Sequence, residues 1–142
     1  KLKMLDRIPV DFNNLPPIVK ICAMGKVHSL LQRIKEGEDF RFNNDWPARE
    51  AAYRGKHEIL EVLLDKGVPT NTGNGALLKL ACAEGYLNIV HILVKRKADI
   101  SLNNYEAYKW AIAKERQNIV DYLEPLVKQK KFFDKHLEEK KL

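Results

Sequence analysis

The sequence predicts an all-α solenoid of about four helix-turn-helix repeats, with short connecting arms and a helix that caps the C-terminal end. The segment "GKHEILEVLLDKG" at 55–67 returns as "GYLNIVHILVKRK" at 85–97 and as "ERQNIVDYLEPLV" at 115–127, an interval of 30 residues each time. A weaker copy, "GKVHSLLQRIKEG", occupies 25–37. Self-similarity at a fixed interval of this size is typical of stacked-repeat proteins.

Single residues keep the same 30-residue interval. Asparagine occurs at Asn14, Asn44, Asn74 and Asn104. Glycine occurs at Gly25, Gly55 and Gly85, and Glu115 interrupts this series. Glycine adopts a positive φ without strain, and asparagine is among the residues that best tolerate that conformation. We therefore expect a turn at both positions of each repeat.

Each repeat is expected to contain two helices joined by the glycine turn. In the second repeat, the first helix has a small-residue face made of Ala48, Ala51 and Ala52. The second helix has an apolar face made of Ile59, Leu60, Leu63 and Leu64. Both spacings are helical. The expected helix pairs are 16–24 with 26–36, 46–54 with 56–66, 76–84 with 86–96, and 106–114 with 116–124.

The segments between helix pairs predict brief extended arms. Apolar residues alternate there with period two, as at Phe40 and Phe42 or at Ile100 and Leu102. Such alternation places two side chains on one face of an extended segment.

One repeat cannot bury its own apolar face, so the repeats must stack. We divide the chain into three parts. Residues 1–13 are the end of a preceding or capping repeat, and residues 125–142 are a basic capping helix and tail. Residues 14–124 are the repeat domain, with repeats at about 14–43, 44–73, 74–103 and 104–124. Because the chain begins with Lys1, we expect a fragment or a processed chain.

The C-terminal segment is interpreted as a cap. Pro125 should end or kink the last second helix, because proline lacks an N–H donor. Leu126, Phe133 and Leu137 lie at spacings of seven and four, so they form one stripe on a helix through about residue 139. This stripe would cover the open end of the stack. The alternative is a projecting basic helix that binds a partner.

The pattern of helix, glycine turn and helix in "KHEILEVLLDKG" and "YLNIVHILVKRKADI" resembles the ankyrin repeat over about residues 10–126. The 30-residue interval is shorter than the family's usual ~33 residues. The family's Thr-Pro-Leu-His tetrapeptide is also missing, since the second repeat reads "WPAR" and keeps only Pro47. The short interval, with "NNDWPAREAA", is similar to arrays common in giant viruses and some phages. A viral or microbial source is therefore expected.

The basic character of the chain is concentrated in its ends. The net charge is +6, of which residues 128–142 contribute +3 and residues 1–7 contribute +2, leaving +1 for residues 8–127. A basic pI that arises from the ends is weak evidence for a nucleic-acid groove.

The two cysteines predict a reduced, intracellular protein, which we expect to be cytoplasmic. Cys22 and Cys82 lie two repeat intervals apart. If each repeat advances the stack by about 8–10 Å, the distance between two packed helices, the two Cα atoms are much farther apart than the limit of about 7 Å for a disulfide. Unpaired buried cysteines are typical of reducing compartments. If the chain is viral, the compartment would be the host cytoplasm.

The sequence offers no chemistry of an enzyme. The four histidines fall in different repeat columns, and no phosphate loop or nucleophile motif occurs. No apolar run approaches the ~20 residues of a membrane-spanning helix. We therefore predict no catalytic residue, no metal, no cofactor, no small-molecule substrate and no membrane.

The ankyrin resemblance implies that the stack binds another protein on a concave face formed by the arm tips and the first helices. If the chain is viral, that partner would be a host factor. Binding energy at interfaces concentrates in Trp, Tyr and Arg. The expected anchors at this face are Trp46, Tyr53, Arg54, Tyr105 and Trp110. The residues expected to set orientation are Asp45, Glu50 and Lys114. For each anchor the competing interpretation is an ordinary packing residue, above all for Trp110.

Two other functions stay open. Arg49, Lys79 and Lys109 would place one cation on each first helix, so that with the basic ends they could follow a nucleic-acid backbone. Local pairing, such as Glu106 with Lys109, competes with that interpretation. A third function is an enzyme inhibitor or scaffold within a longer chain. The column of Glu50 should be partly open, because an unpaired charge is rarely buried, and Glu50 could pair with Lys20.

Overall fold

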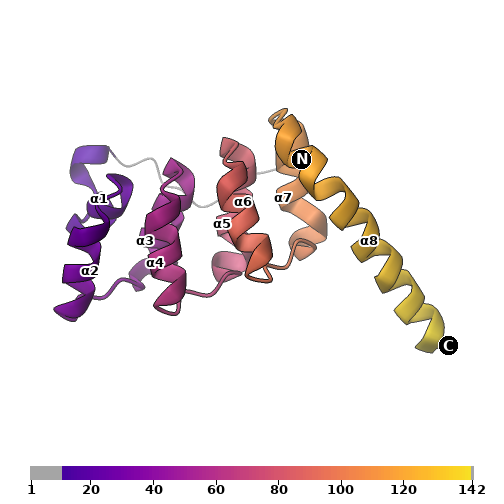
Figure 1. The fold of residues 1–142 in the computed structure, drawn as a ribbon, viewed down its shortest axis with the longest axis horizontal. Helices are drawn as coiled ribbons and strands as arrows, with labels where there is room; N and C mark the ends of the chain where they lie inside the picture. Colours follow the sequence, from indigo (N-terminus) through magenta and orange to yellow (C-terminus); the bar gives the residue numbers. More distant parts are fainter. Residues whose placement is uncertain (1–10, 142) are drawn as a thin grey trace.

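A computed structural model describes residues 11–141, which fold into eight α-helices after a short 3-10 helix at Phe12–Asn14 (Figure 1). The helices are α1 (Pro17–Ala23), α2 (Val27–Lys35), α3 (Phe42–Arg54), α4 (His57–Asp65), α5 (Thr72–Glu84), α6 (Leu87–Lys95), α7 (Leu102–Ala113) and α8 (Gln117–Lys141). The described part contains no β-strand. The predicted all-helical stack is confirmed. Residues 1–10 of the predicted N-terminal segment lie outside the described residues.

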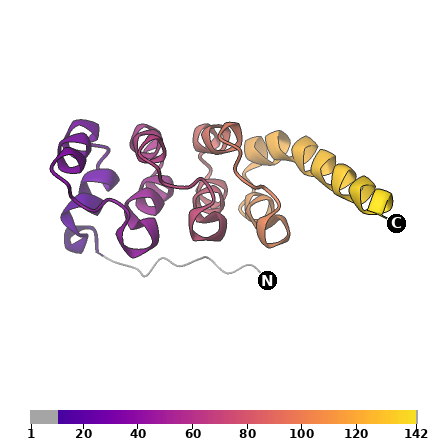
Figure 2. The same ribbon diagram turned by 90° about the horizontal axis from the view of Figure 1, so that it is seen from below.

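The helices form two layers that run the length of the stack. The first helices of the repeats, α1, α3, α5 and α7, pack side by side in one layer, and the second helices, α2, α4, α6 and α8, form the other (Figure 2). Each first helix also packs against the second helix of its own repeat.

Buried side chains fill the space between these layers. Leu60, Leu77 and Leu93 have no exposed surface, and neither have Ala51 and Ala81. The alanines lie where first helices meet, and their small side chains let the neighbouring backbones approach closely. One continuous cluster of buried residues extends from Leu15 to Leu123. The stack therefore shares a single core, as its repeat pattern predicts.

The asparagine column lies in a left-handed turn that precedes three of the first helices. In the second repeat, Asn43, Asn44 and Asp45 have φ values of 54°, 57° and 58°. Residues 73–75 and 103–105 adopt the same conformation. Regular helix begins only after each turn, near the predicted starts at 46, 76 and 106. The predicted arms are not extended where they meet these turns, because Arg41, Asn71 and Ser101 have ψ values of 0°, 17° and −5°. Asn14 departs from the column because it lies in the 3-10 helix.

The C-terminal segment corrects two predictions. Pro125 was predicted to end or kink the last second helix, and it does not end it, because α8 continues through it from Gln117 to Lys141. Pro125 is exposed, so water can satisfy the carbonyl group that the missing N–H leaves unbonded.

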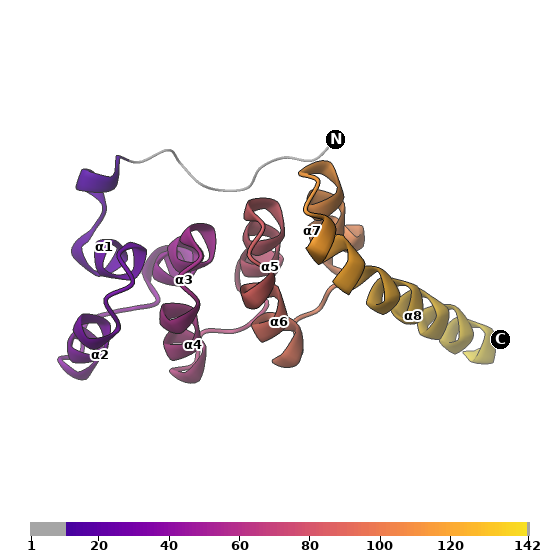
Figure 3. The same ribbon diagram turned by 45° about the horizontal axis from the view of Figure 1, so that its top comes forward.

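The second half of α8 does not cap the stack either. Val127 is buried, whereas all residues from 128 to 140 are exposed. Phe133 and Leu137, which were predicted to cover the end of the stack, are 55% and 59% exposed. The helix leaves the stack and projects beyond α7 (Figures 1 and 3).

Candidate functional site

A groove of about 320 Å³ lies over the C-terminal ends of the first helices. It is lined by Ala23, Tyr53, Arg54, Lys56, Glu84 and Tyr86. Tyr53 and Arg54 are two of the predicted anchors, and both end α3. Ala23 and Glu84 occupy the corresponding ends of α1 and α5. The structure thus places two aromatic side chains, two cations and one carboxylate around a single groove that spans three repeats.

The buried carboxylate of Glu50 holds the Arg54 side chain in place. Arg54 Nε donates to Oε2 of Glu50 over 2.7 Å, and Trp46 Nε1 donates to Oε1 of Glu50 over 3.3 Å. Glu50 is only 2% exposed. The prediction that its column is partly open is therefore wrong at Glu50, because a charged partner four residues further along the helix compensates its burial. Lys20, in the same column, is half-buried. Glu50 orients Arg54 and does not itself reach the surface.

Aromatic rings flank the Arg54 guanidinium. Its Cζ lies 5.0 Å from the centre of the Phe12 ring and 5.9 Å from that of Tyr53. Lys20 Nζ lies 5.5 Å from the same Phe12 ring. Cations near the faces of aromatic rings are attracted to them. The contacts with Glu50 and the rings together limit the conformations of Arg54, while 27% of its side chain remains exposed.

Two residues of the groove, Lys56 and Tyr86, were not predicted. Each directly follows a turn glycine and covers the glycine of the preceding repeat. A Cβ atom added to Gly55 would lie 2.7 Å from the Tyr86 ring, and one added to Gly25 would lie 3.3 Å from the Lys56 side chain. The sequence contained a signal for this role, because these residues keep the 30-residue interval one position after each glycine.

Asp45, one of the residues expected to set the orientation of a partner, makes its contacts within the chain. Its side chain is buried, and it accepts hydrogen bonds from Arg41 Nε over 2.8 Å, from Arg41 Nη2 over 3.0 Å and from the Thr72 hydroxyl. Burial alone would raise the pKa of Asp45, but the hydrogen bonds from Arg41 and Thr72 and the charges of Arg41 and Arg49 outweigh it and lower this pKa. Asp45 therefore ties the arm of the second repeat to the start of α5.

The remaining predicted residues lie outside the groove. Tyr105 and Trp110 are 8% and 7% exposed, so both pack mainly inside the stack. Lys131 Nζ lies 5.0 Å from the centre of the Tyr105 ring, and Lys114 Nζ lies 5.8 Å from that of Trp110. Of the three predicted residues Tyr105, Trp110 and Lys114, only Lys114 is exposed. The burial of Trp110 agrees with the packing interpretation.

The three cations of the first helices have different environments. Arg49 donates to the carbonyl oxygens of Asn44 and Asn43 over 3.0 and 2.8 Å. Lys79 is 6% exposed and pairs with Glu106 of the next repeat over 3.2 Å. Lys109 is exposed. The expected pairing of Glu106 is therefore corrected, because its partner is Lys79. A ladder of exposed cations, as a nucleic-acid backbone would require, is not formed.

The described residues hold no group of three or more His, Cys, Asp or Glu side chains that could bind a metal ion. None of the described helices is both long enough and apolar enough to span a bilayer. Cys22 and Cys82 are buried thiols that form no disulfide. Burial raises the pKa of each to about 12, and the charge of Glu50 adds to the effect at Cys22.

Comparison with known proteins agrees with this architecture. A family model of ankyrin repeats in three copies matches residues 18–104 and, in a second overlapping match, residues 49–131. The chain is also 28% identical over 116 residues to "Ankyrin repeat and KH domain-containing protein mask-1" of Caenorhabditis elegans. That match covers 78% of this chain but only 4% of the nematode protein.

Proposed function

The chain belongs to the ankyrin repeat family, and on that premise we propose that it is a non-catalytic module that binds another protein. The proposed site lies on the face formed by the first helices, which we expect to be the concave face. Ankyrin repeats generally mediate contacts between proteins. The observation that carries the proposal for this chain is the groove around Tyr53 and Arg54.

The groove has the properties of an interface centre. Tyrosine and arginine are over-represented among residues that dominate binding energy. Arg54 is already oriented by Glu50, so a partner would lose little conformational entropy in binding it. Lys56 and Glu84 place opposite charges at the rim, where they would select the orientation of a partner. In this proposal Trp46 and Glu50 support the site. Asp45 holds the turn at the start of α3, and Tyr105, Trp110 and Lys114 form a separate, weaker region.

The source and location are narrower proposals. A viral protein that targets a host factor in the cytoplasm is supported by the resemblance of the 30-residue repeats to viral arrays. A reducing, cytoplasmic location is supported by the two unpaired cysteines. Neither proposal changes the assignment of the groove.

Affinity capture with matched variants tests the proposal. Tyr53→Ala removes the ring of Tyr53, and Arg54→Lys removes the planar guanidinium but keeps a positive charge for the buried Glu50. Leu31→Ala is the control, because Leu31 is 40% exposed on α2, in the other layer. We expect proteins captured by the parent chain to fall about tenfold or more with either groove variant, a loss of about 1.4 kcal/mol, and to persist with the control. Unchanged capture by folded groove variants would contradict the proposal.

A further inference from the structure

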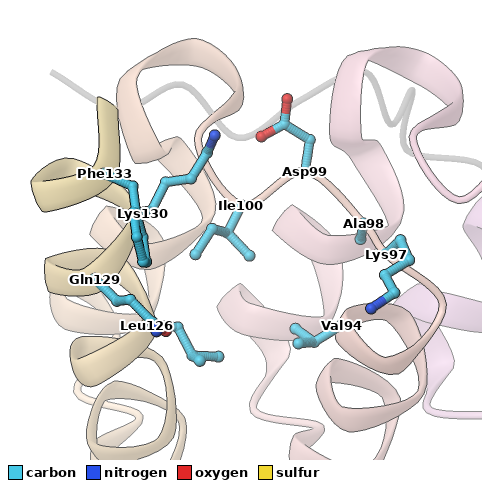
Figure 4. Close-up of a pocket in the computed structure, with 9 residues that line it drawn as sticks. All are labelled: Val94, Lys97, Ala98, Asp99, Ile100, Leu126, Gln129, Lys130 and Phe133. Carbon is cyan, nitrogen blue, oxygen red and sulfur yellow. The ribbon is translucent and has the colours of Figure 1, made fainter. Parts of the chain in front are cut away.

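A second surface lies at the other end of the stack, beside α8. A groove of about 570 Å³ separates α8 from α6 and from the connection that follows α6. Leu126 and Phe133 of α8 face Val94 and Ile100 across this groove (Figure 4). Leu137 lies one turn beyond Phe133 and is also exposed. We call these five residues the α8 surface.

The α8 surface continues a heptad pattern that begins inside the stack. Spacings of four and three alternate along Ile119, Leu123, Leu126, Lys130, Phe133, Leu137 and Lys140. Ile119 and Leu123 are buried, Leu126 is half-buried, and Phe133 and Leu137 are exposed. A stripe of two positions in seven is the narrow seam by which helices pair in coiled coils. The stack covers the start of this seam and leaves its end uncovered.

The charges around the seam favour an acidic partner. Residues 128–141 contain six lysines and three acidic residues, so this segment has a net charge of +3. Lys97 and Lys130 lie at the rim of the groove, and Lys140 occupies a later seam position. Lys130 also pairs with Asp134 over 3.3 Å, but this pair is exposed and therefore weak. Asp99, the acidic residue that lines the groove, already accepts hydrogen bonds from the Ser101 hydroxyl and backbone N–H over 2.6 and 2.9 Å. The net charge offered to a partner helix is positive.

The same charges disfavour a second copy of this chain. A parallel pair of α8 helices would place Lys130 against Lys130 and Lys140 against Lys140. An antiparallel pair would bring together two segments of net charge +3. Like charges across a helix seam oppose pairing, and a lysine at a seam position is a known determinant of partner choice.

A membrane surface fits the segment less well than a protein helix does. Helices that bind anionic membranes have a broad apolar face and a polar face rich in cations. Here the seam is narrow, and Asp134, Glu138 and Glu139 reduce the positive charge.

We propose that the α8 surface binds an acidic amphipathic helix of a partner protein. The partner helix lies in the groove along Leu126, Phe133 and Leu137, with carboxylates opposite Lys130 and Lys140. This is the mode in which an amphipathic helix occupies an apolar groove. The site is separate from the groove at Tyr53 and Arg54, so it stands whether or not that groove binds a partner.

A designed peptide can test this surface with the full chain. The probe is an acidic helix with leucine at its seam positions and glutamate beside them, and the comparison peptide carries lysine in place of glutamate. Isothermal titration of each peptide at low salt measures affinity. We expect the acidic peptide to bind at least about tenfold more tightly than the basic one, a difference of about 1.4 kcal/mol. Its affinity should also fall as salt is added.

Variants of two adjacent phenylalanines distinguish binding along the seam from binding to any exposed apolar side chain. Phe132 and Phe133 are 60% and 55% exposed, but only Phe133 lies on the seam. We expect Phe133→Ser to weaken binding of the acidic peptide about tenfold and Phe132→Ser to leave it nearly unchanged. Lys130→Glu should reduce the preference for the acidic peptide, because it lowers the net charge of residues 128–141 from +3 to +1. Circular dichroism should show the parent fold in all three variants, because all three side chains are exposed.

Several outcomes would overturn the proposal. Equal binding of both peptides would contradict the preference for an acidic partner. Equal losses of binding with Phe132→Ser and Phe133→Ser would show that the peptide does not bind along the seam. Binding to phosphatidylserine vesicles without binding to the acidic peptide would show a membrane surface instead. A dimer in light scattering that Phe133→Ser dissociates would show that a second copy occupies the surface.

Discussion

The interior repeats and the second half of α8 have the same kind of apolar stripe, but the stripe is buried in the repeats and exposed in α8. Leu93 and Leu137 both belong to apolar stripes at helical spacing, yet Leu93 is fully buried and Leu137 is 59% exposed. The difference is the neighbour: a second layer and two adjacent repeats surround Leu93, whereas nothing in the described chain covers Leu137. An apolar stripe therefore identifies the face of a helix that can be covered, and a neighbouring element decides whether it is covered.

The largest expected effect is the loss of a buried leucine. Leu93→Ala should lower the free energy of unfolding by about 2–5 kcal/mol, because it creates a cavity between layers. Leu137→Ala is the matched change in the projecting segment and should cost less than about 0.5 kcal/mol. Chemical denaturation of both variants measures the difference. Similar losses at the two positions would mean that the end of α8 is also buried.

The turn glycines extend the comparison to the backbone. Gly37 and Gly55 both have positive φ, at 88° and 74°, but only Gly55 is covered, by the Tyr86 ring of the next repeat. Gly37→Ala should cost about 1–2 kcal/mol through left-handed strain alone. Gly55→Ala should cost about 1–3 kcal/mol more, because the added methyl group overlaps the ring. Thermal unfolding of the two variants checks the order, and an equal cost would exclude the ring contact.

A buried carboxylate gives the interior a dependence on pH. The folded pKa of Asp45 is lowered, so its contribution to stability is present above the unfolded value of about 3.9 and is lost as the pH falls through the folded value. Asp45→Asn should therefore destabilise the chain at pH 7 by about 1–3 kcal/mol. The variant should also lose less stability on acidification below about pH 4.

Denaturation at several pH values measures this effect. Asp134→Asn is the control in the projecting segment, where Asp134 pairs with Lys130 across an exposed surface. A pH profile of Asp45→Asn parallel to that of the parent chain would contradict the role assigned to Asp45.

The last prediction concerns the reactivity of the two cysteines, and no change in stability is expected. Cys22 and Cys82 are buried, and burial raises the pKa of both thiols to about 12. At pH 8 they should react with a disulfide reagent only when the stack opens, because the thiolate is the reactive form. A thiol introduced by Lys135→Cys should react at once. Rapid reaction of the native cysteines would indicate a loose core.

The sequence predicted the stack because its repeat pattern is local and is copied several times. The helix pairs, the glycine turns and the asparagine column all follow from the 30-residue interval. The burial of Glu50 was not predicted, because it depends on Arg54 folding back over it. Tyr86 was missed for a related reason: its role is defined by a glycine in the preceding repeat.

The end of the stack was the hardest part to predict. The stripe of Leu126, Phe133 and Leu137 has the spacing of a buried face, and that spacing is the same whether the helix caps the stack or projects from it. The direction of α8 is set by tertiary packing up to Val127, which no pattern within residues 128–142 records.

Hydrogen exchange measured by mass spectrometry tests the central claim, that α1 to α7 and the first half of α8 share one core and that the rest of α8 is uncovered. We expect slow exchange, at the level of global unfolding, in α3 to α6, and exchange near the rate of an isolated helix for residues 130–141. Protection that continues undiminished to residue 141 in the isolated chain would contradict the account. Uniformly fast exchange in the interior helices would do the same.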